Sequence, residues 1–339
     1  MTTLTTQAAA GPALDPGKAR SLQRVTSPDG FFLICALDHL SDFQQLLAPD
    51  PGTVDYARTV EAKLELIRAL VPEVSAFLLD ARFGLAPAIF SRALPGNVGL
   101  MASIEDEDYQ HRPGARKTRF REHWGTRQIK LIGADVCKLL WFYRPDAPTA
   151  EHQRQVVAQL VAECRELSLP LVVEPIWYPL GGEDTTSSAW RRRRVDGIIE
   201  SAHTAAELGV DMLKVEFPGD VGSEEGRSAA AEACGRLDAG VEVPWVILSA
   251  GVGYDDFKRQ VEIASAAGGS GFLAGRSIWR DAVSIHEPER RHLAARQAAG
   301  RLAELAAITR AVGCPFRPAL EGKDLVAALA EDWYVDWHS

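Results

Sequence analysis

Eight short apolar runs, each followed by a loop and then usually by a stretch with helical periodicity, constrain the fold of this chain more than any other feature. The runs span residues 31–37, 75–80, 97–102, 134–140, 170–175, 210–216, 244–250 and 270–275. Continuous apolar strands separated by helices are typical of a parallel sheet that helices cover. Eight strand-helix units predict an α/β fold, a closed (β/α)8 TIM barrel.

The helical stretches between the runs have apolar residues at three- and four-residue spacing, as Tyr56, Val60, Leu64 and Ile67 show. Gly133 and Gly209 end two of them just before the next strand, as helix C-caps do. The dinucleotide fingerprint GxGxxG is missing after the first strand, which weakens the alternative of an open doubly wound sheet. The predicted helices span residues 55–70, 116–132, 150–168, 192–208, 223–239 and 254–267.

The two ends of the chain lack the strand-helix pattern of its centre. Residues 1–17, rich in Thr, Ala, Gly and Pro, predict a flexible N-terminal tail. Residues 18–312 form the predicted barrel, whose last part is a long helix near 286–312. Residues 313–339, with a short helix near 323–332, are expected to be a C-terminal extension packed on the barrel rather than a second domain.

Charge and cysteine content narrow the function and the compartment. A net charge of −9 argues against binding to nucleic acid or to an anionic membrane, because both need a positive surface. The five cysteines form no CxxC pair, which suits reduced thiols in a cytoplasmic protein. Because the sequence shows no basic region followed by an apolar core and no run of eighteen apolar residues, we expect neither a signal peptide nor a membrane span. Trp and Leu on the late helices could form the interface of a homo-oligomer.

Lys214 lies in the run Asp211-Met-Leu-Lys-Val-Glu-Phe-Pro218, where a barrel core usually has aliphatic residues. Burying an ammonium without a partner is costly, so a lysine there tends to lose its proton and become a nucleophile. Its most common use is a Schiff base with a carbonyl substrate. The structural alternative is a lysine that reaches solvent or pairs with Glu216.

Residues at the carboxyl ends of barrel strands face the active site. Lys138, two strands before Lys214, would lower the pKa of Lys214 by charge repulsion. Asp38 and Glu174 would transfer protons, in an assignment that the sequence leaves open. Six of the eight strand ends have a chargeable residue, namely Asp38, Asp80, Lys138, Glu174, Lys214 and Arg276.

The last two strands are followed by glycine-rich turns that predict a phosphate site. Ser249 and Gly251 follow the seventh strand, and Gly275 and Arg276 follow the eighth. Barrel enzymes bind phosphate with the loops after these two strands, through backbone amides and a guanidinium group. The expected partner is therefore a small-molecule sugar phosphate.

From about residue 20 to residue 312, the chain resembles tagatose 1,6-bisphosphate aldolase and its relatives, the class I aldolases that include sulfofructosephosphate aldolase. The similar motifs are LDH at 37–39, FLLDARFGLAP at 77–87, CKLLWFYRPD at 137–146, VVEP at 172–175, LKVEFP at 213–218, ILSAGV at 247–252 and AGRSIW at 274–279. The resemblance implies a metal-independent enzyme without a cofactor that cleaves a ketose phosphate to dihydroxyacetone phosphate and an aldehyde. It also implies that Lys214 forms the Schiff base beside Lys138, Glu174 and Asp38, and that Ser249, Gly251, Gly275 and Arg276 bind the C1 phosphate.

The sequence departs from this family directly after the first strand. The family usually has Asp-Gln-Arg there, and its Gln-Arg pair helps to hold the far anionic end of the sugar, whereas Asp38 is followed by His39 and Leu40. We therefore expect a ketose 1-phosphate whose far end differs and could lack a phosphate. The candidates for contacts at the aldehyde end are His39, Asp80 and Arg82, and the arginines that could replace the missing one are Arg82, Arg119 and Arg144.

Three other functions are compatible with parts of the pattern. A zinc-dependent aldolase would need several converging histidines, but of the eight histidines only His39 lies at a strand end. A transaldolase would share the lysine chemistry and pass the three-carbon fragment to an acceptor aldehyde. A non-catalytic sugar-phosphate sensor would have no need for both lysines and both acids.

Overall fold

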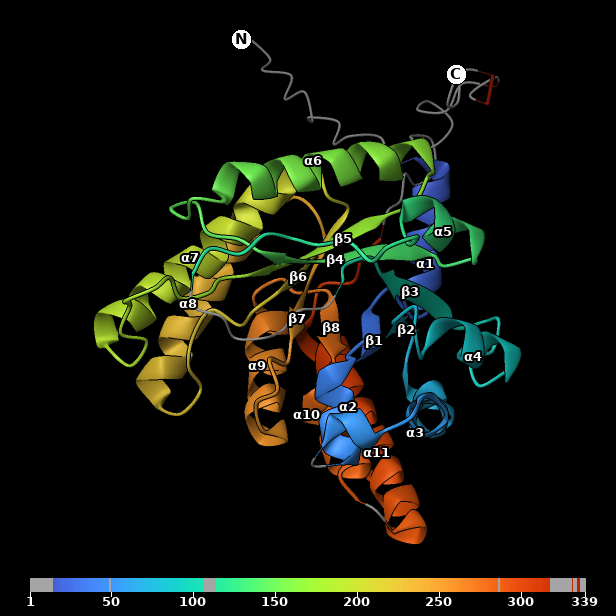
Figure 1. The fold of residues 1–339 in the computed structure, drawn as a ribbon. Helices are drawn as coiled ribbons and strands as arrows, with labels where there is room; N and C mark the ends of the chain where they lie inside the picture. The colour runs from blue at the N-terminus through green and yellow to red at the C-terminus, as the bar shows by residue number, and fades with distance from the viewer. Residues whose placement is uncertain are drawn as a thin grey trace, which may run out of the picture.

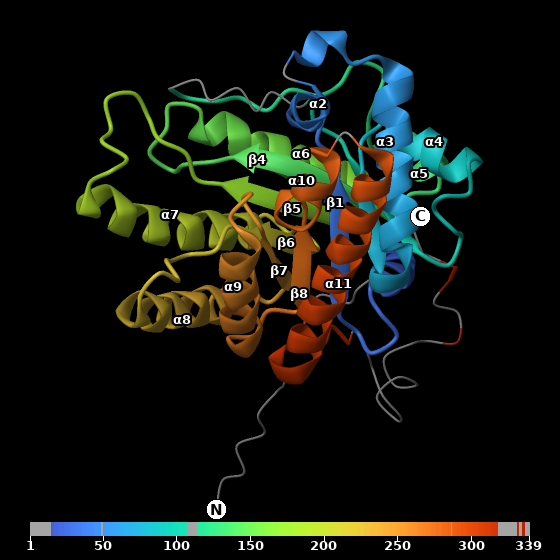
Figure 2. The same ribbon diagram turned by 90° about the horizontal axis from the view of Figure 1, so that it is seen from below.

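The computed structural model describes residues 15–48, 50–106, 114–285 and 287–317, together with residues 331, 334 and 335. Eight parallel strands pair in sequence order and close through the pair β1 and β8 (Figures 1 and 2). The strands are β1 (Phe32–Leu37), β2 (Ala76–Leu79), β3 (Gly99–Ser103), β4 (Val136–Phe142), β5 (Leu171–Ile176), β6 (Met212–Val215), β7 (Trp245–Leu248) and β8 (Gly271–Ala274). The predicted (β/α)8 barrel is confirmed.

Helices surround the strands, and α11 packs against α3, α9 and α10 (Figure 2). They are α1 (Pro16–Val25), α2 (Ser41–Leu47), α3 (Tyr56–Leu70), α4 (Leu85–Phe90), α5 (Thr126–Leu131), α6 (Ala150–Glu166), α7 (Ser188–Glu207), α8 (Glu224–Ala239), α9 (Tyr254–Ala266), α10 (Arg276–Val283) and α11 (Pro288–Val312). Two single 3-10 turns, Pro51–Thr53 and Val71–Glu73, flank α3.

Alternate residues of the strands fill the inside of the barrel, as the two-residue repeat of a strand requires. They form a cluster separate from the one between strands and helices. Leu22 and Val25 of α1 belong to this inner cluster, so α1 closes the amino-terminal end of the barrel. The inner cluster contains Phe32, Ile34, Ala36, Ala76, Leu78, Met101, Val136, Val172, Met212, Val246 and Leu273.

The predicted helix at 116–132 is wrong over most of its length, because helical structure begins only at Thr126. Residues 114–125 follow the mouth of the barrel as a loop, whose polar groups bond outside the segment. The backbone N–H of Thr118 donates to Gln153, and the indole of Trp124 donates to the carbonyl of Ser103. These tertiary contacts replace the hydrogen bonds that a helix would make.

Four helices were not predicted. They are α1, α2, α4 and α10. Asp15 caps α1 by accepting from the backbone N–H of Lys18, and Pro16 stands at its first position. The predicted tail lies outside the described residues except for residues 15–17, which begin α1. The predicted helix at 323–332 also lies outside them except for residue 331.

Candidate active site

Two lysines and three carboxylates meet at the carboxyl end of the barrel. Lys138 of β4 has its ammonium 2.9 Å from Glu174, 2.7 Å from Glu105 and 3.2 Å from Asp38. Lys214 of β6 lies 2.8 Å from the same Glu174 oxygen, Oε2. All five side chains are buried. The four residues that the sequence predicted as catalytic are therefore brought together.

Lys214 is held inside the barrel, with 5% of its surface exposed. It donates to Glu174 and not to Glu216 in the described structure. Glu216 instead accepts from Arg194 at 2.5 Å and from the backbone N–H of Trp177 at 2.9 Å. The amine therefore points into the charged cluster, as a nucleophile there would have to.

Burial and neighbouring charges act against each other on the titrating groups. Burial alone would raise the pKa of Asp38, but the positive charges of Lys138 and Lys214 outweigh it and hold this pKa well below its usual value. Burial lowers the pKa of His39 to about 3, and only Asp38 opposes it strongly. Asp38 is therefore ionised and His39 neutral at neutral pH.

Glu105 was missed by the sequence prediction. It follows β3 by two residues, and its Oε1 atom lies 2.7 Å from Lys138. Its other oxygen is buried without a hydrogen-bond partner in the described structure. An antiparallel bridge to Phe120 fixes the backbone at Glu105 beyond the strand end. The sequence offered one indication of this role. Glu105 follows the third apolar run by three residues, and no chargeable residue had been assigned to the end of that run.

The turns after β7 and β8 lie against each other, as the predicted phosphate site requires. The backbone N–H of Gly275 faces the Ser249 hydroxyl at 3.4 Å, and the Ser277 hydroxyl donates to the carbonyl of Val252 at 2.5 Å. Gly251 has a left-handed φ of 74°, which favours glycine. The guanidinium of Arg276 lies beside Gly251, since a Cβ atom there would be 3.4 Å from its Nε atom.

The candidates for the aldehyde end occupy different surroundings. His39 packs edge-on against Trp279, and its ring lies next to Gly275, on the side of the phosphate turns. Asp80 is buried and accepts from Lys63 and from the backbone N–H groups of Arg82 and Phe83. These contacts occupy both oxygens of Asp80, so its role in this structure is to hold the turn after β2.

The arginines expected to replace the missing one also differ. Arg144 is buried between Asp146 and Glu183, at 2.8 and 2.6 Å, so its charge is already balanced. Arg82 is exposed, with its guanidinium 4.8 Å from the centre of the Phe83 ring. Arg119 is exposed in the loop over the mouth. Of the three, Arg144 is the least able to bind a further anion.

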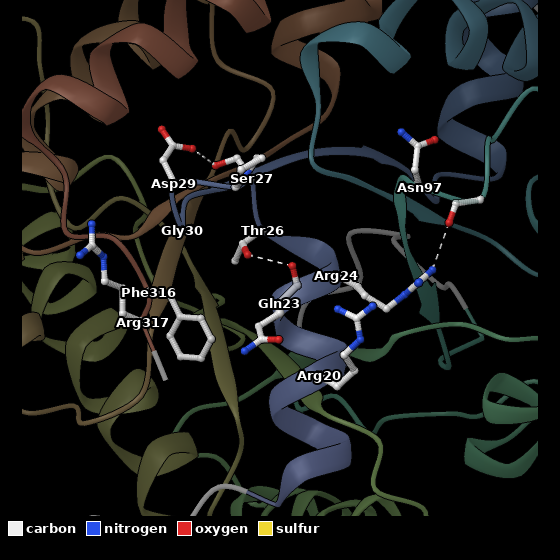
Figure 3. A pocket seen from close by; sticks show the side chains of 12 residues that line it. Arg20, Gln23, Arg24, Thr26, Ser27, Asp29, Gly30, Asn97, Phe316 and Arg317 are labelled. Carbon is white, nitrogen blue, oxygen red and sulfur yellow. Dashed lines mark hydrogen bonds between the residues drawn. The ribbon is translucent and has the colours of Figure 1, made fainter. Parts of the chain in front are cut away.

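A recess of about 860 Å³ lies at the opposite end of the barrel (Figure 3). It is lined by α1, by the turn before β1, by Asn97 and by Phe316 and Arg317. Because strands begin at this end, the recess is remote from the charged cluster. Within the described ranges, no group of His, Cys, Asp and Glu side chains could hold a metal ion, and no helix could cross a membrane.

Comparison with known proteins agrees with the resemblance to the tagatose 1,6-bisphosphate aldolase family. The model of a family described as "DeoC/LacD family aldolase" matches residues 35–281. A protein of Enterococcus faecalis named "Tagatose 1,6-diphosphate aldolase 2" is 29% identical over 80% of this chain and 85% of its own length. A Listeria monocytogenes protein named "Tagatose 1,6-diphosphate aldolase" is 28% identical over 80% of this chain and 83% of its own.

Solved structures show the same fold. An archaeal fructose 1,6-bisphosphate aldolase superposes with a TM-score of 0.61 at 17% identity, over 87% of this chain and 99% of the other. A structure described as that of a Schiff base forming fructose-1,6-bisphosphate aldolase gives a TM-score of 0.60 at 18% identity, over 86% of this chain and 99% of the other. At such identities the likeness concerns the fold alone.

Proposed function

The chain belongs to the DeoC/LacD family of aldolases, and from this membership we propose that it cleaves a ketose 1-phosphate through a Schiff base on Lys214. The products would be dihydroxyacetone phosphate and an aldehyde. The observation that carries the proposal is the buried contact of 2.8 Å between Lys214 and Glu174, which pairs a nucleophile with a proton acceptor.

The proposed reaction starts with the amine of Lys214, which adds to the C2 carbonyl of the open-chain ketose. The carbinolamine loses water and becomes an iminium ion. Removal of the proton from the C4 hydroxyl breaks the bond between C3 and C4, and its electrons move to the iminium nitrogen. The aldehyde leaves, the enamine takes a proton at C3, and water releases dihydroxyacetone phosphate and restores the amine.

Glu174 is the group that we propose for these proton transfers. It touches the nitrogen of Lys214, and a carrier must both accept and release a proton. Asp38 suits this less well, because its pKa is held far below neutral pH. Asp38 and Glu105 would instead fix the charged Lys138 in place.

For the substrate, we propose a phosphate at C1 and a far end without a second phosphate. Ser249, Gly251, Gly275 and Arg276 offer amides, a hydroxyl and a guanidinium group to the C1 phosphate. At the far end, Leu40 stands where the family arginine is expected, and Arg144 is already paired. Fructose 1-phosphate should therefore have a higher kcat/KM than fructose 1,6-bisphosphate. Equal values for the two would contradict this part of the proposal.

The test of the nucleophile is reduction with borohydride in the presence of a panel of ketose phosphates, followed by mass spectrometry of the peptides. We expect the added mass on Lys214 in the parent protein. Lys214→Met should give no adduct and no cleavage, whereas Lys258→Met, which removes an exposed lysine of α9, should behave as the parent does. An adduct on Lys138 would assign the nucleophile to the other lysine.

The same reaction mixtures separate cleavage from transfer. An aldolase releases dihydroxyacetone phosphate when no acceptor aldehyde is present, whereas a transaldolase retains the fragment on the enzyme until an acceptor is added. We also propose that no metal takes part, and activity should then persist after treatment with a chelator. A cytoplasmic location agrees with the reduced cysteines and is part of this proposal.

A further inference from the structure

Two guanidinium groups of α10 lie over the turn after β7. A Cβ atom built on Gly251 would lie 2.7 Å from an Nη atom of Arg280 and 3.4 Å from Nε of Arg276. Both arginines belong to the same helix, one turn apart, so they present their charges to the same turn. The proposed phosphate site thus contains a second arginine that the sequence pattern did not identify.

The two arginines differ in what they contact. Nη1 of Arg276 lies 2.8 Å from Oδ2 of Asp42, in an ion pair whose side chains are 31% and 26% exposed. For Arg280, no carboxylate lies within ion-pair distance in the part of the chain that the structure describes. The turn therefore faces two positive charges and one negative charge.

Asp42 comes from a different part of the barrel. It lies in the first turn of α2, four residues after Asp38 and two residues after Leu40, where the sequence departs from the Asp-Gln-Arg pattern. A carboxylate and a phosphate both bind a guanidinium group through two oxygens. Asp42 therefore occupies a donor of Arg276 that a phosphate at this turn would use.

We propose that Asp42 is a built-in competitor of the substrate phosphate, and that Arg280 is a second cation of the same subsite. Phosphate binding then exchanges the partner of Arg276: the carboxylate of Asp42 leaves, the phosphate takes its place, and Arg280 supplies the second guanidinium. The partial exposure of the ion pair allows this exchange without opening the core. The inference rests on the phosphate site of the proposed function and names how that site is regulated.

The test uses the intact protein and inorganic phosphate, with affinity measured by calorimetry at constant ionic strength. Asp42→Asn keeps the shape of the side chain and removes its charge, so it should bind phosphate about two- to fivefold more tightly than the parent. Arg280→Gln should bind it about two- to tenfold more weakly. Arg276→Gln should bind more weakly still, because it loses the central donor.

Matched variants separate a local effect from a change in overall charge. Asp281→Asn removes a carboxylate from the same helix, where it pairs with Arg301, and Arg259→Gln removes an exposed arginine of α9. Both should bind phosphate as the parent does. The proposal is overturned if Asp42→Asn binds no more tightly than Asp281→Asn, if Arg280→Gln matches Arg259→Gln, or if the parent does not bind phosphate.

The phosphate affinities and the cleavage of ketose phosphates are measured separately, so a failure of one proposal can be told from a failure of the other. A protein that shows the expected order of phosphate affinities but cleaves no ketose phosphate would contradict the proposed function and support the competition. A protein that cleaves ketose phosphates but shows no effect of Asp42→Asn or Arg280→Gln would support the proposed function and contradict the competition.

Discussion

At the scale of single residues, one carboxylate oxygen connects the two lysines of the site. Glu174 Oε2 lies 2.8 Å from Lys214 and 2.9 Å from Lys138. A buried carboxylate between two ammonium groups lowers the cost of burying both, because each positive charge has an anionic partner. The same oxygen is available to the amine that must lose its proton.

Glu174→Gln tests this dual role. The amide keeps the volume of the side chain but cannot take a proton, so we expect kcat to fall by about 10²- to 10⁴-fold. Steady-state kinetics on a substrate identified by the trapping experiment give the measurement. Glu166→Gln, on the exposed face of α6, is the matched control and should retain the parent kcat. A Glu174→Gln protein that keeps kcat within about twofold would show that another group carries the proton.

A second buried ion pair lies outside the charged cluster. Lys63 of α3 is fully buried, and its ammonium donates to Asp80 and to the carbonyls of Leu37 and His39. It thereby connects the ends of β1 and β2. In the sequence, Lys63 lies three residues after Val60 and four before Ile67, so its spacing places it on the buried face of the helix, but its partners do not follow from the helical period.

Lys63→Met should lower the free energy of unfolding by about 3–5 kcal/mol, because it leaves the buried carboxylate of Asp80 without its partner. Urea denaturation measures this loss. Lys258→Met, which removes an exposed lysine, should cost far less. A loss for Lys63→Met no larger than that of the control would mean that Asp80 is stabilised by the two backbone N–H groups alone.

The positions of the site residues could be predicted from the sequence where these residues lie within a strand. Lys138, Glu174 and Lys214 lie within β4, β5 and β6, so their order along the barrel follows from the apolar runs. Glu105 lies beyond its strand, in a backbone bridge with Phe120, and its side chain reaches Lys138. A contact that depends on a loop cannot be predicted from strand periodicity.

At the scale of elements, α1 is a helix that the apolar pattern of the sequence did not predict. Its Leu22 and Val25 close the inside of the barrel, and Lys18 pairs with Asp211 at the start of β6. The helix is short, and the composition of the preceding residues predicted a tail. Asp15 and Pro16 are a capping residue and a first helical residue, so the start of a helix could have been predicted from them. That the helix covers the open end of the barrel could not be predicted, because this contact exists only once the barrel has closed.

Leu22→Ala should lower the free energy of unfolding by about 2–5 kcal/mol, since it leaves a cavity under the inner cluster. Thermal or urea unfolding measures the loss, and KM should not change because α1 lies at the end opposite to the site. Leu131→Ala, at a leucine of α5 that is 71% exposed, is the control and should change stability by about 0.5 kcal/mol or less. A change in KM for Leu22→Ala would show that the two ends of the barrel are coupled.

At the scale of the whole molecule, the eight-unit period in the sequence was sufficient to predict the barrel. The alternation of apolar runs with helical stretches recurs along the chain, so an error in one helix, such as 116–132, does not change the topology. The closed barrel then fixes which strand ends face one another. The balance of charge within that ring also connects the site to the stability of the entire fold.

The dependence of stability on pH follows from His39. Its pKa is about 6.5 when unfolded and about 3 when folded, so between these values the unfolded state binds more protons. Stability from this group is present above pH 6.5 and is lost as pH falls toward 3, by about 1.4 kcal/mol per pH unit. Glu216, whose pKa burial raises, acts in the opposite direction: its contribution is present below pH 4.5 and is lost as pH rises.

His39→Gln isolates this effect, because the carboxylates are common to both proteins. Urea denaturation at pH 7, 6 and 5 should show the parent losing stability relative to His39→Gln, with most of the difference arising below pH 6. His152→Gln, which removes an exposed imidazole of α6, should follow the parent. Parallel curves for the parent and His39→Gln would mean that the pKa of His39 does not change on folding, so that the ring takes up a proton next to the ionised Asp38 as readily as in the unfolded chain. The burial of this ring against Trp279 and Gly275 argues for the neutral form, since a charge there would lose its hydration close to Arg276.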